Sequence, residues 1–438
     1  MTNMPPQLQR QADRWYELIP HPVQLDLVQA IPSGIRFPLV PAGRRSGKTE
    51  RFKRFIVKQA NRHPGMYFAA APTYNQAKRI FWQDLKDLSF SYLHARKPSE
   101  SELIIYFDNG SEVHVLGLDK PERFEGISWT GGGIDEFANV KESAWEANIF
   151  PALNTVDPRN PDYRAWAWLF GVPEGLNHFY ELCESARENG QDFAVYHWKS
   201  ADILPPDVIE SAKRSMSAKQ YRQEFEASFE TATGRIYEDY SEANLTDTVI
   251  HPHEQLHWTH DQNFTPLSSA VGVIRDDCLY LLDEIVLSSA ISRQSADEFV
   301  EKFKDHKNKH VKLYGDPAGR AGEKHGHKSD YSEIKDVLRR NGWKVTDKVK
   351  RKHPAIKDRQ NYVRARILNA AGDVRLFVNP KTAPWCHKGL STVQLLEGST
   401  FQEDQRNKYQ HITTAIGYMV DAIWGDVPLI LTGVRSAM

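Results

Sequence analysis

A short run near the N-terminus has the composition and spacing of a phosphate-binding loop. Residues 42–49 read AGRRSGKT, with alanine in place of the first glycine of the usual pattern, and an apolar run over 35–40 precedes them. Backbone N–H groups of such a loop surround phosphates, and the helix that follows adds the positive end of its dipole. We expect Lys48 to reach the β- and γ-phosphates of ATP and the Thr49 hydroxyl to bind Mg²⁺. The other nucleotide-binding residues predicted in the loop are Gly43, Ser46 and Gly47.

A second motif supplies the acids that nucleotide hydrolysis needs. Asp135 and Glu136 follow the short run 132–134, which reads GGI. We expect Asp135 to hold the same magnesium ion, directly or through water, and Glu136 to orient or deprotonate the attacking water. The alternative is a pair of surface acids without a catalytic role.

Three more residues are candidates for contact with the nucleotide. Arg44 and Arg45 lie inside the loop, where one of them is suited to stabilise charge on the transferring phosphate. The alternative for each is an arginine that faces solvent or DNA. Gln24 precedes the loop by a short distance, where many nucleic-acid motors place a glutamine on the adenine edge. An ordinary surface glutamine is the alternative there.

Two aspartates in the second half follow apolar runs and are candidate metal ligands. Asp261 comes after the run 256–260, and Asp316 comes after the run 311–314 in the stretch YGDPAG. Mg²⁺ and Mn²⁺ favour oxygen ligands, and two-metal phosphodiester hydrolysis uses carboxylates that converge on ions about 3.5–4 Å apart. The pattern therefore predicts a two-metal nuclease site, with a turn role as the alternative for each aspartate.

The elements that must position the first set of residues alternate along the chain. Apolar runs of strand length are separated by amphipathic stretches, which predicts an α/β domain with a mainly parallel sheet. Polar residues over about 235–250 predict a linker. The expected strands are 35–40, 66–71, 103–107, 113–118 and 165–172, and the expected helices are 49–61 and 75–88, with a helical region over 205–229.

The second half begins a new strand pattern. Three closely spaced apolar runs predict consecutive antiparallel strands, and a helix and a further strand follow. That order is the order of a ribonuclease-H-like fold. The expected strands are 256–260, 270–275, 279–287, 311–314, one near 343 and 374–378, and the expected helices are 293–305, 331–340 and 412–424.

Composition limits the classes of protein to which the chain can belong. Its 438 residues are more than one hydrophobic core of ordinary size contains, so the length indicates two domains. Three widely separated cysteines have no disulfide or zinc spacing, which fits a reducing cytoplasm. The first twenty residues lack a secretion signal, and no uncharged apolar run approaches about 18 residues, so we expect no membrane span.

The charge distribution along the chain is compatible with a nucleic-acid partner. The formal net charge is only −1, but residues 335–366 are distinctly basic. A solvated helix face and a phosphate-contacting surface both explain such a run. The phosphate contacts expected under the second explanation are Lys348, Lys350, Arg351, Lys352, Arg364 and Arg366.

Several short motifs, taken in order, resemble the large terminase subunit of tailed bacteriophages. They are GRRSGKT at 43–49, APTY at 71–74 with QAK at 76–78, RFEG at 123–126, IDE at 134–136, GVPEG at 171–175, FY at 179–180 and YRQEF at 221–225. The resemblance implies a RecA-like P-loop ATPase domain over 1–240, including a helical linker region, and a ribonuclease-H-like endonuclease domain over 245–438. Val172 departs from the Thr or Ser that is usual in the family.

The resemblance also implies a function. It implies a motor that pumps double-stranded DNA into a procapsid and a nuclease that cuts the concatemeric genome. The implied partners are double-stranded DNA, a small terminase subunit and the portal, with the chain acting as a homo-oligomeric ring in the host cell cytoplasm. In a ring, an arginine can act across the subunit interface, and Arg79 and Arg123 are further candidates.

The third metal ligand of the nuclease stays open. The family places an aspartate on the last helix, at the position of Thr414 in the stretch HITTAIGY. Asp421, seven residues later on the same helix face, is the favoured replacement. His411 and Glu284 are the alternatives.

Two other functions compete with the packaging motor. A P-loop DNA helicase or translocase with a non-catalytic DNA-binding C-terminal domain would unwind strands and cut nothing. An ATP-switched scaffold would turn ATP over slowly, without stimulation by DNA. The pair Asp261 and Asp316 argues against the first alternative, and the set Lys48, Asp135 and Glu136 argues against the second.

Overall fold

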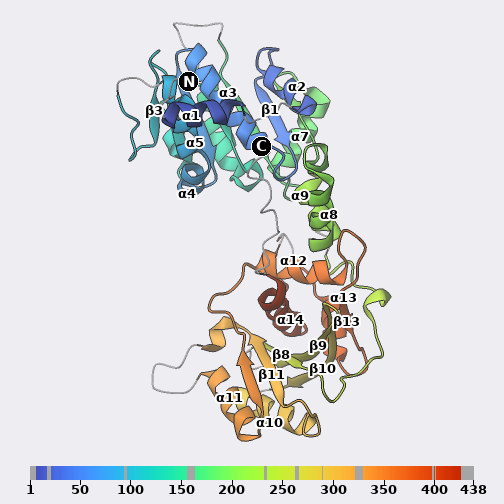
Figure 1. Ribbon diagram of the computed structural model, residues 1–438. Helices are drawn as coiled ribbons and strands as arrows, with labels where there is room; N and C mark the ends of the chain where they lie inside the picture. Colours follow the sequence, from blue (N-terminus) through green and yellow to red (C-terminus); the bar gives the residue numbers. More distant parts are fainter. Residues whose placement is uncertain are drawn as a thin grey trace. The chain divides into compact units, whose positions relative to one another are not determined.

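The chain divides into two compact units (Figure 1). The first unit contains the described residues up to Ile209 together with 222–230, and the second contains 210–221 and the described residues from 234 to 425. The structure is a computed structural model that describes residues 6–16, 21–92, 96–154, 163–230, 234–261, 266–288, 290–320, 329–396, 399 and 401–425.

A seven-stranded sheet forms the centre of the first unit, in the order β3-β4-β2-β5-β6-β1-β7. Strand β3 pairs antiparallel with β4, and the other five pairs are parallel, as the sequence predicts. The position of β6 between β1 and β5 brings the ends of these two strands to one sheet edge. The strands are β1 (Phe37–Pro41), β2 (Met66–Ala71), β3 (Ile104–Tyr106), β4 (Glu112–Gly117), β5 (Trp129–Ile134), β6 (Trp166–Gly171) and β7 (Phe193–Val195).

Helices cover both faces of this sheet because alternate strand residues point to opposite faces. On one face, Phe52 and Phe55 of α3 pack against Trp168, and the rings of Phe55 and Trp168 stack 4.6 Å apart. On the other face, Phe179 of α7 packs among residues that include Phe37. The helices are α1 (Pro6–Tyr16), α2 (Pro22–Ala30), α3 (Lys48–Arg62), α4 (Tyr74–Ala77), α5 (Gln83–Ser89), α6 (Phe150–Leu153) and α7 (His178–Asn189), with π-helical turns at Lys78–Trp82 and Ala144–Ile149.

The helical region expected over 205–229 consists of two helices. They are α8 (Pro206–Ser215) and α9 (Ala218–Phe225). Buried Ser217 separates them, and its hydroxyl accepts a hydrogen bond from the Gln220 backbone N–H at 3.2 Å. Along the chain, α8 begins in the first unit and ends in the second, and α9 begins in the second unit and ends in the first.

The sheet of the second unit has six strands in the order β12-β11-β8-β9-β10-β13. Strands β8, β9 and β10 are antiparallel neighbours, and β11 then pairs parallel with β8. This arrangement confirms the strand order predicted from the sequence. The strands are β8 (Leu256–Asp261), β9 (Leu267–Arg275), β10 (Cys278–Leu287), β11 (His310–Gly315), β12 (Lys344–Asp347) and β13 (Leu376–Val378).

Two apolar clusters lie against the second sheet. Helices α10 and α11 cover one cluster, in which Trp258 stacks on Phe299 at 4.2 Å. Helix α14 belongs to the other cluster and is fixed to β8 where the Thr259 hydroxyl donates to the Ala415 carbonyl oxygen at 2.6 Å. The helices are α10 (Ser292–Lys302), α11 (Asp330–Arg340), α12 (Ile356–Ile367), α13 (Pro384–Thr392) and α14 (Gln410–Trp424).

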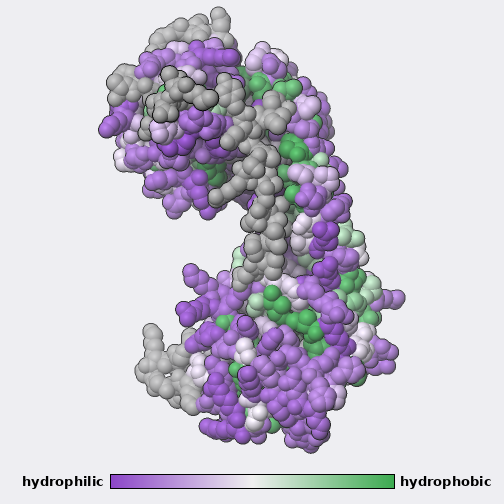
Figure 2. All heavy atoms as spheres, in the orientation of Figure 1, coloured by the Kyte–Doolittle hydropathy of each residue, from purple (hydrophilic) through white to green (hydrophobic). Residues whose placement is uncertain are grey.

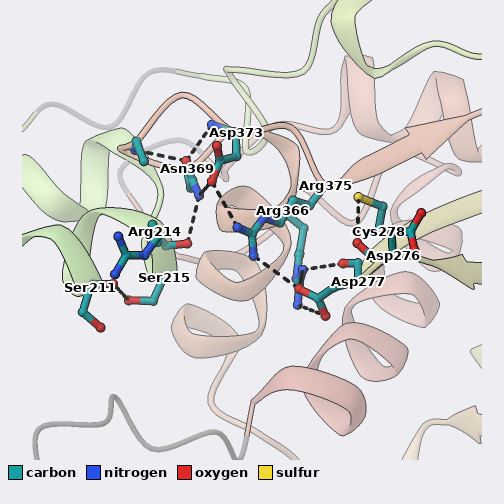
Figure 3. Close-up of polar contacts among 11 residues, drawn as sticks. Ser211, Arg214, Ser215, Asp276, Asp277, Cys278, Arg366, Asn369, Asp373 and Arg375 are labelled. Carbon is teal, nitrogen blue, oxygen red and sulfur yellow. Dashed lines mark hydrogen bonds and ion pairs between the residues drawn. The ribbon is translucent and has the colours of Figure 1, made fainter.

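Helix α12 corrects the interpretation of the basic segment. Arg364 and Arg366 lie on α12 and are buried, so the prediction that they contact DNA is wrong. Arg364 Nε donates to the Ile236 carbonyl oxygen at 2.7 Å. Arg366 Nη1 lies 2.9 Å from Asp277 Oδ2, and Arg375 reaches the same carboxylate at 3.3 Å (Figure 3). These guanidinium groups therefore bind inside the second unit.

Across the described ranges, every helix is too short or too polar to cross a bilayer.

A buried histidine makes the stability of the second unit depend on pH. His257 on β8 lies against Tyr314 on β11, with 2.9 Å between Nδ1 and the phenol oxygen. Burial lowers the pKa of His257 to about 4. Because the unfolded chain takes up this proton below about pH 6.5, the stabilisation is present above that pH and is lost as the pH falls towards 4.

We predict a loss of about 2 kcal/mol from this residue between pH 7 and pH 5. The variant His257→Gln should lose correspondingly less stability over the same interval. Urea unfolding of both proteins at the two pH values measures the difference. An identical pH dependence would contradict the assignment.

Candidate functional site

The phosphate loop leaves β1 and ends where α3 begins at Lys48. Gly47 precedes the helix with φ +79°, a left-handed conformation that glycine adopts without strain. The Ser46 hydroxyl and the buried Lys48 ammonium both approach the Gly43 carbonyl oxygen, at 2.5 Å and 3.4 Å. Burial lowers the pKa of Lys48, and the charges of Asp135 and Glu136 oppose that shift. The predicted residues of the loop therefore come together at one place.

The hydroxyl of Thr49 and the carboxylate of Asp135 meet although 86 positions separate them in the sequence. Thr49 Oγ1 donates to Asp135 Oδ2 at 2.9 Å. The Asp135 backbone N–H donates to the Ala70 carbonyl oxygen at 2.9 Å, which fixes the end of β5 against β2. A hydroxyl and a carboxylate are oxygen ligands of the kind that Mg²⁺ prefers. The two side chains can hold one ion together with phosphate oxygens and water.

Glu136 follows directly in a left-handed conformation, with φ +54°. Burial raises the pKa of its carboxyl group, and the neighbouring Asp135 raises it further. Lys48 and Arg44 lower the pKa of the same group, so all four charges are close enough to influence one another. The structure thus brings Glu136 beside the phosphate loop.

Arg44 pairs with an acid from the C-terminal part of the first unit. Arg44 Nε lies 2.5 Å from Glu224 Oε2, and the Arg44 backbone N–H donates to the Glu224 carbonyl oxygen at 2.6 Å. The Ser200 hydroxyl donates to the Arg44 carbonyl oxygen at 2.7 Å. The motif YRQEF at 221–225 contains Glu224 but gives it no role at the site, and no sequence motif contains Ser200, since the two residues lie 180 and 156 positions from Arg44. Arg45 is exposed, with φ +58°.

Gln24 also lies at the loop. Its Nε2 donates to the Ser46 carbonyl oxygen at 2.7 Å, and its Oε1 accepts from Arg51 at 2.9 Å. The alternative of a surface glutamine does not hold, because Gln24 is 2% exposed. The other arginine candidates, Arg79 and Arg123, are exposed.

The second group of acids lies at the carboxyl ends of β8 and β11. These strands are parallel neighbours, with Gly315 in register with His260, and the Asp316 backbone N–H donates to the His260 carbonyl oxygen at 3.1 Å. Asp261 and Asp316 therefore follow adjacent strands at one edge. Gly315 has φ +146°, and a Cβ at this position would lie 2.4 Å from the Tyr331 hydroxyl. The glycine is thus required by packing inside the unit.

Three further side chains surround these aspartates. His411 Nδ1 lies 3.0 Å from Asp261 Oδ2. His353 Nδ1 lies 3.5 Å from Asp316 Oδ1 and 3.2 Å from the Tyr418 hydroxyl. Burial raises the pKa of Tyr418 to about 12, and both aspartates add to the shift, so the phenol lies near the two acids. No sequence motif singles out His353 as a site residue.

The acids considered as third ligand have other partners. Asp421 is buried on α14, and its Oδ2 lies 3.1 Å from Lys350 Nζ. Glu284 accepts hydrogen bonds from the backbone N–H groups of Trp385 at 2.9 Å and Cys386 at 3.0 Å, so it caps the start of α13. Of the residues that the structure describes, no three His, Cys, Asp or Glu side chains converge closely enough to hold a metal ion.

Thr414 faces a charged cluster. Its hydroxyl lies 3.2 Å from a carboxylate oxygen of Glu403, whose other oxygen lies 3.1 Å from Arg359. Asp261 and Asp316 are therefore the two candidate oxygen ligands at this edge of the sheet, which we call the rim. Such a donor set suits Mg²⁺ or Mn²⁺ when phosphate oxygens and water complete the coordination.

Exposed cations follow β12 near this rim. Lys348, Arg351 and Lys352 are exposed in the loop that leads to His353, whereas Lys350 is half-buried and pairs with Asp421. Figure 2 shows that hydrophilic residues cover most of the visible face of the second unit. Three of the six predicted phosphate contacts thus lie on an accessible surface.

Comparison with known proteins finds a matching family model, sequences that are similar over part of the chain, and similar folds. Residues 39–242 match the family model described as terminase large subunit, T4likevirus-type, N-terminal. The terminase large subunit of Thermus phage G20c is 25% identical over an alignment of 284 residues, and the match covers 56% of this chain and 56% of that protein. This chain therefore matches little more than half the length of that relative.

The fold extends further than the sequence match. The large terminase of a thermophilic bacteriophage has a TM-score of 0.61 at 17% identity, with 93% of this chain and 99% of that chain covered. A second structure of that protein, in complex with ATP-gamma-S, has a TM-score of 0.57 at 17% identity and covers 92% of this chain and 98% of its own. The predicted fold class, an α/β P-loop RecA-like domain followed by a ribonuclease-H-like domain, is confirmed.

The position of Glu284 generates a prediction that separates a cap from a metal ligand. The variant Glu284→Ala leaves buried N–H groups of α13 without their acceptor, which should lower the free energy of unfolding by about 1–3 kcal/mol. Mn²⁺ affinity should not change. Urea unfolding and calorimetric Mn²⁺ titration test both statements, with the exposed Glu301→Ala on α10 as a control. A loss of Mn²⁺ binding at unchanged stability would show a ligand instead.

Proposed function

We propose that this chain, whose residues 39–242 match the family model of the terminase large-subunit N-terminal domain, hydrolyses ATP to move double-stranded viral DNA into a procapsid. We propose further that its second unit cuts the concatemeric genome as a metal-dependent endonuclease. The observation that carries the proposal is a pair of strand-end sites in one chain. The contact of Thr49 with Asp135 at 2.9 Å forms the first, and Asp261 beside Asp316 forms the second. A packaging motor needs both chemistries.

The residues of the first site divide the work of hydrolysis. Lys48 binds the β- and γ-phosphates, and Thr49 and Asp135 hold Mg²⁺, which neutralises phosphate charge when bound. Glu136 orients the attacking water and accepts its proton. Arg44 and Arg45 are the loop arginines proposed to act on the transferring phosphate, and Arg44 must leave Glu224 to do so. Gln24 lies against the loop. The structurally similar large terminase of the thermophilic bacteriophage has been crystallised with ATP-gamma-S and with ADP, which supports ATP as the nucleotide.

In the second site, Asp261 and Asp316 hold one or two Mg²⁺ or Mn²⁺ ions, which supply an activated water for phosphodiester hydrolysis when bound. His411 orients the Asp261 carboxylate through their 3.0 Å contact. For Asp421 to act as the third ligand, its carboxylate must exchange Lys350 for a metal ion.

The proposed partners follow from the same function. Duplex DNA binds through its phosphates, with little sequence readout, and Lys348, Arg351 and Lys352 are the exposed contacts. A small terminase subunit and the portal of the procapsid complete the assembly, in which the chain forms a homo-oligomeric ring in the host cell cytoplasm. The proposed limits of the two catalytic domains are residues 1–240 and 245–438.

The ATPase proposal predicts the effect of removing the loop lysine. Lys48→Ala should lower ATP hydrolysis by a factor on the order of 10²–10³, because a charge that stabilises the transition state is lost. Phosphate release by purified protein measures the rate. Arg62→Ala, an exposed change at the end of the same helix, should leave the rate at the parent value. Equal rates in the parent and Lys48→Ala would reject the assigned site.

The nuclease proposal predicts the effect of removing one carboxylate. In Mg²⁺ or Mn²⁺, the parent should nick and linearise supercoiled plasmid, and Asp316→Asn should not, since the rim then keeps a single carboxylate. Glu298→Gln, an exposed change on α10, is the matched control. A plasmid that stays intact with the parent in both metals would favour the alternative, a DNA translocase with a non-catalytic second domain.

A further inference from the structure

Gln24 uses both ends of its side-chain amide inside the protein. Nε2 donates to the Ser46 carbonyl oxygen at 2.7 Å, and Oε1 accepts from Arg51 Nη2 at 2.9 Å. A carbonyl requires a donor and a guanidinium requires an acceptor, so these partners determine which end of the amide is nitrogen. The side chain is 2% exposed. One N–H group and one lone pair of the amide remain unused by these partners, but burial covers them, so an adenine base can reach them only if the packing around Gln24 changes.

The surroundings of Gln24 hold the amide in this orientation. Helix α2 buries Leu27 and Ala30 on the side that also carries Gln24. Arg51 follows on the first turns of α3, and its guanidinium is partly desolvated. Rotation of the amide would leave the guanidinium facing an amide N–H group, which cannot accept its hydrogen bond. If the Gln24 amide turned from the Ser46 carbonyl towards a base, its contacts with Ser46 and with Arg51 would therefore both break.

The bond to Ser46 determines the direction of the next peptide group. The Ser46–Gly47 peptide is planar and trans, so its N–H and C=O groups point in opposite directions. Because the carbonyl points at Gln24, the Gly47 N–H points away from Gln24. A phosphate loop binds phosphate through such backbone N–H groups. Gln24 thus acts on the part of the loop that faces the triphosphate.

We propose that Gln24 is a positioning residue of the phosphate loop and that it does not read the adenine base. It orients the Gly47 N–H for any nucleoside triphosphate, and Arg51 keeps its amide in place. This inference rests on the proposed ATP hydrolysis. It adds to that proposal that Gln24 contributes to binding of the triphosphate and not to recognition of the base.

Two variants test the proposal by different routes. Gln24→Ala removes both contacts. Gln24→Glu keeps an acceptor for Arg51 but loses the donor to Ser46, so it retains the packing and tests the loop contact alone. The control is Gln29→Ala, an exposed change on the same helix. Hydrolysis of ATP and GTP, and binding of their fluorescent mant derivatives, are measured for each protein.

Both Gln24 variants should lose roughly three- to tenfold in activity with each nucleotide, as expected for one hydrogen bond. The ratio of ATP to GTP activity should stay at the parent value, and Gln29→Ala should match the parent. A Gln24 variant that loses ATP activity and keeps GTP activity would overturn the proposal, and so would parent-like activity in Gln24→Glu. If the parent binds both nucleotides but hydrolyses neither, the ATPase proposal fails, and the two binding ratios still decide the role of Gln24.

Discussion

Parallel pairing of strands brings the carboxyl ends of distant segments to one sheet edge, and both candidate sites depend on this pairing. In the first unit, β6 pairs with β1 and with β5, so the phosphate loop and Asp135 leave the same edge. In the second unit, β8 pairs with β11 and sets Asp261 beside Asp316. The side chains that meet at these edges are short, so a shift of register by one residue would separate them.

The buried arginines of α12 have hydrogen-bond partners within the second unit, and these contacts limit what a basic composition implies. Arg364 and Arg366 lie in the most basic part of the sequence, yet their guanidinium groups bind Ile236 and Asp277 inside the second unit. Burial of a charge without a partner is expensive, so each such arginine needs an acceptor nearby. Of the six basic residues predicted to contact phosphate, the exposed ones, Lys348, Arg351 and Lys352, all follow β12.

Local periodicity was enough to predict most strands and helices, because burial of one face imposes a regular spacing of apolar residues. The loop around Lys48 and the acids after β5, β8 and β11 were predictable for the same reason, since each follows an apolar run. Contacts between distant segments could not be predicted from the sequence. The pair of Arg44 with Glu224 and the pair of Asp421 with Lys350 depend on tertiary packing that no short motif records. Helix α12 was missed because its buried arginines hide the apolar period.

The backbone at Glu136 has a consequence for evolution as well as for chemistry. A residue with a Cβ atom in the left-handed region costs about 1–2 kcal/mol relative to an ordinary helical conformation, and glycine would relieve that strain. With φ +54° at this position, stability and activity favour different residues. A screen that selects only for thermal resistance should therefore enrich glycine at position 136 and yield a better-folded protein without the carboxylate that we propose as catalytic.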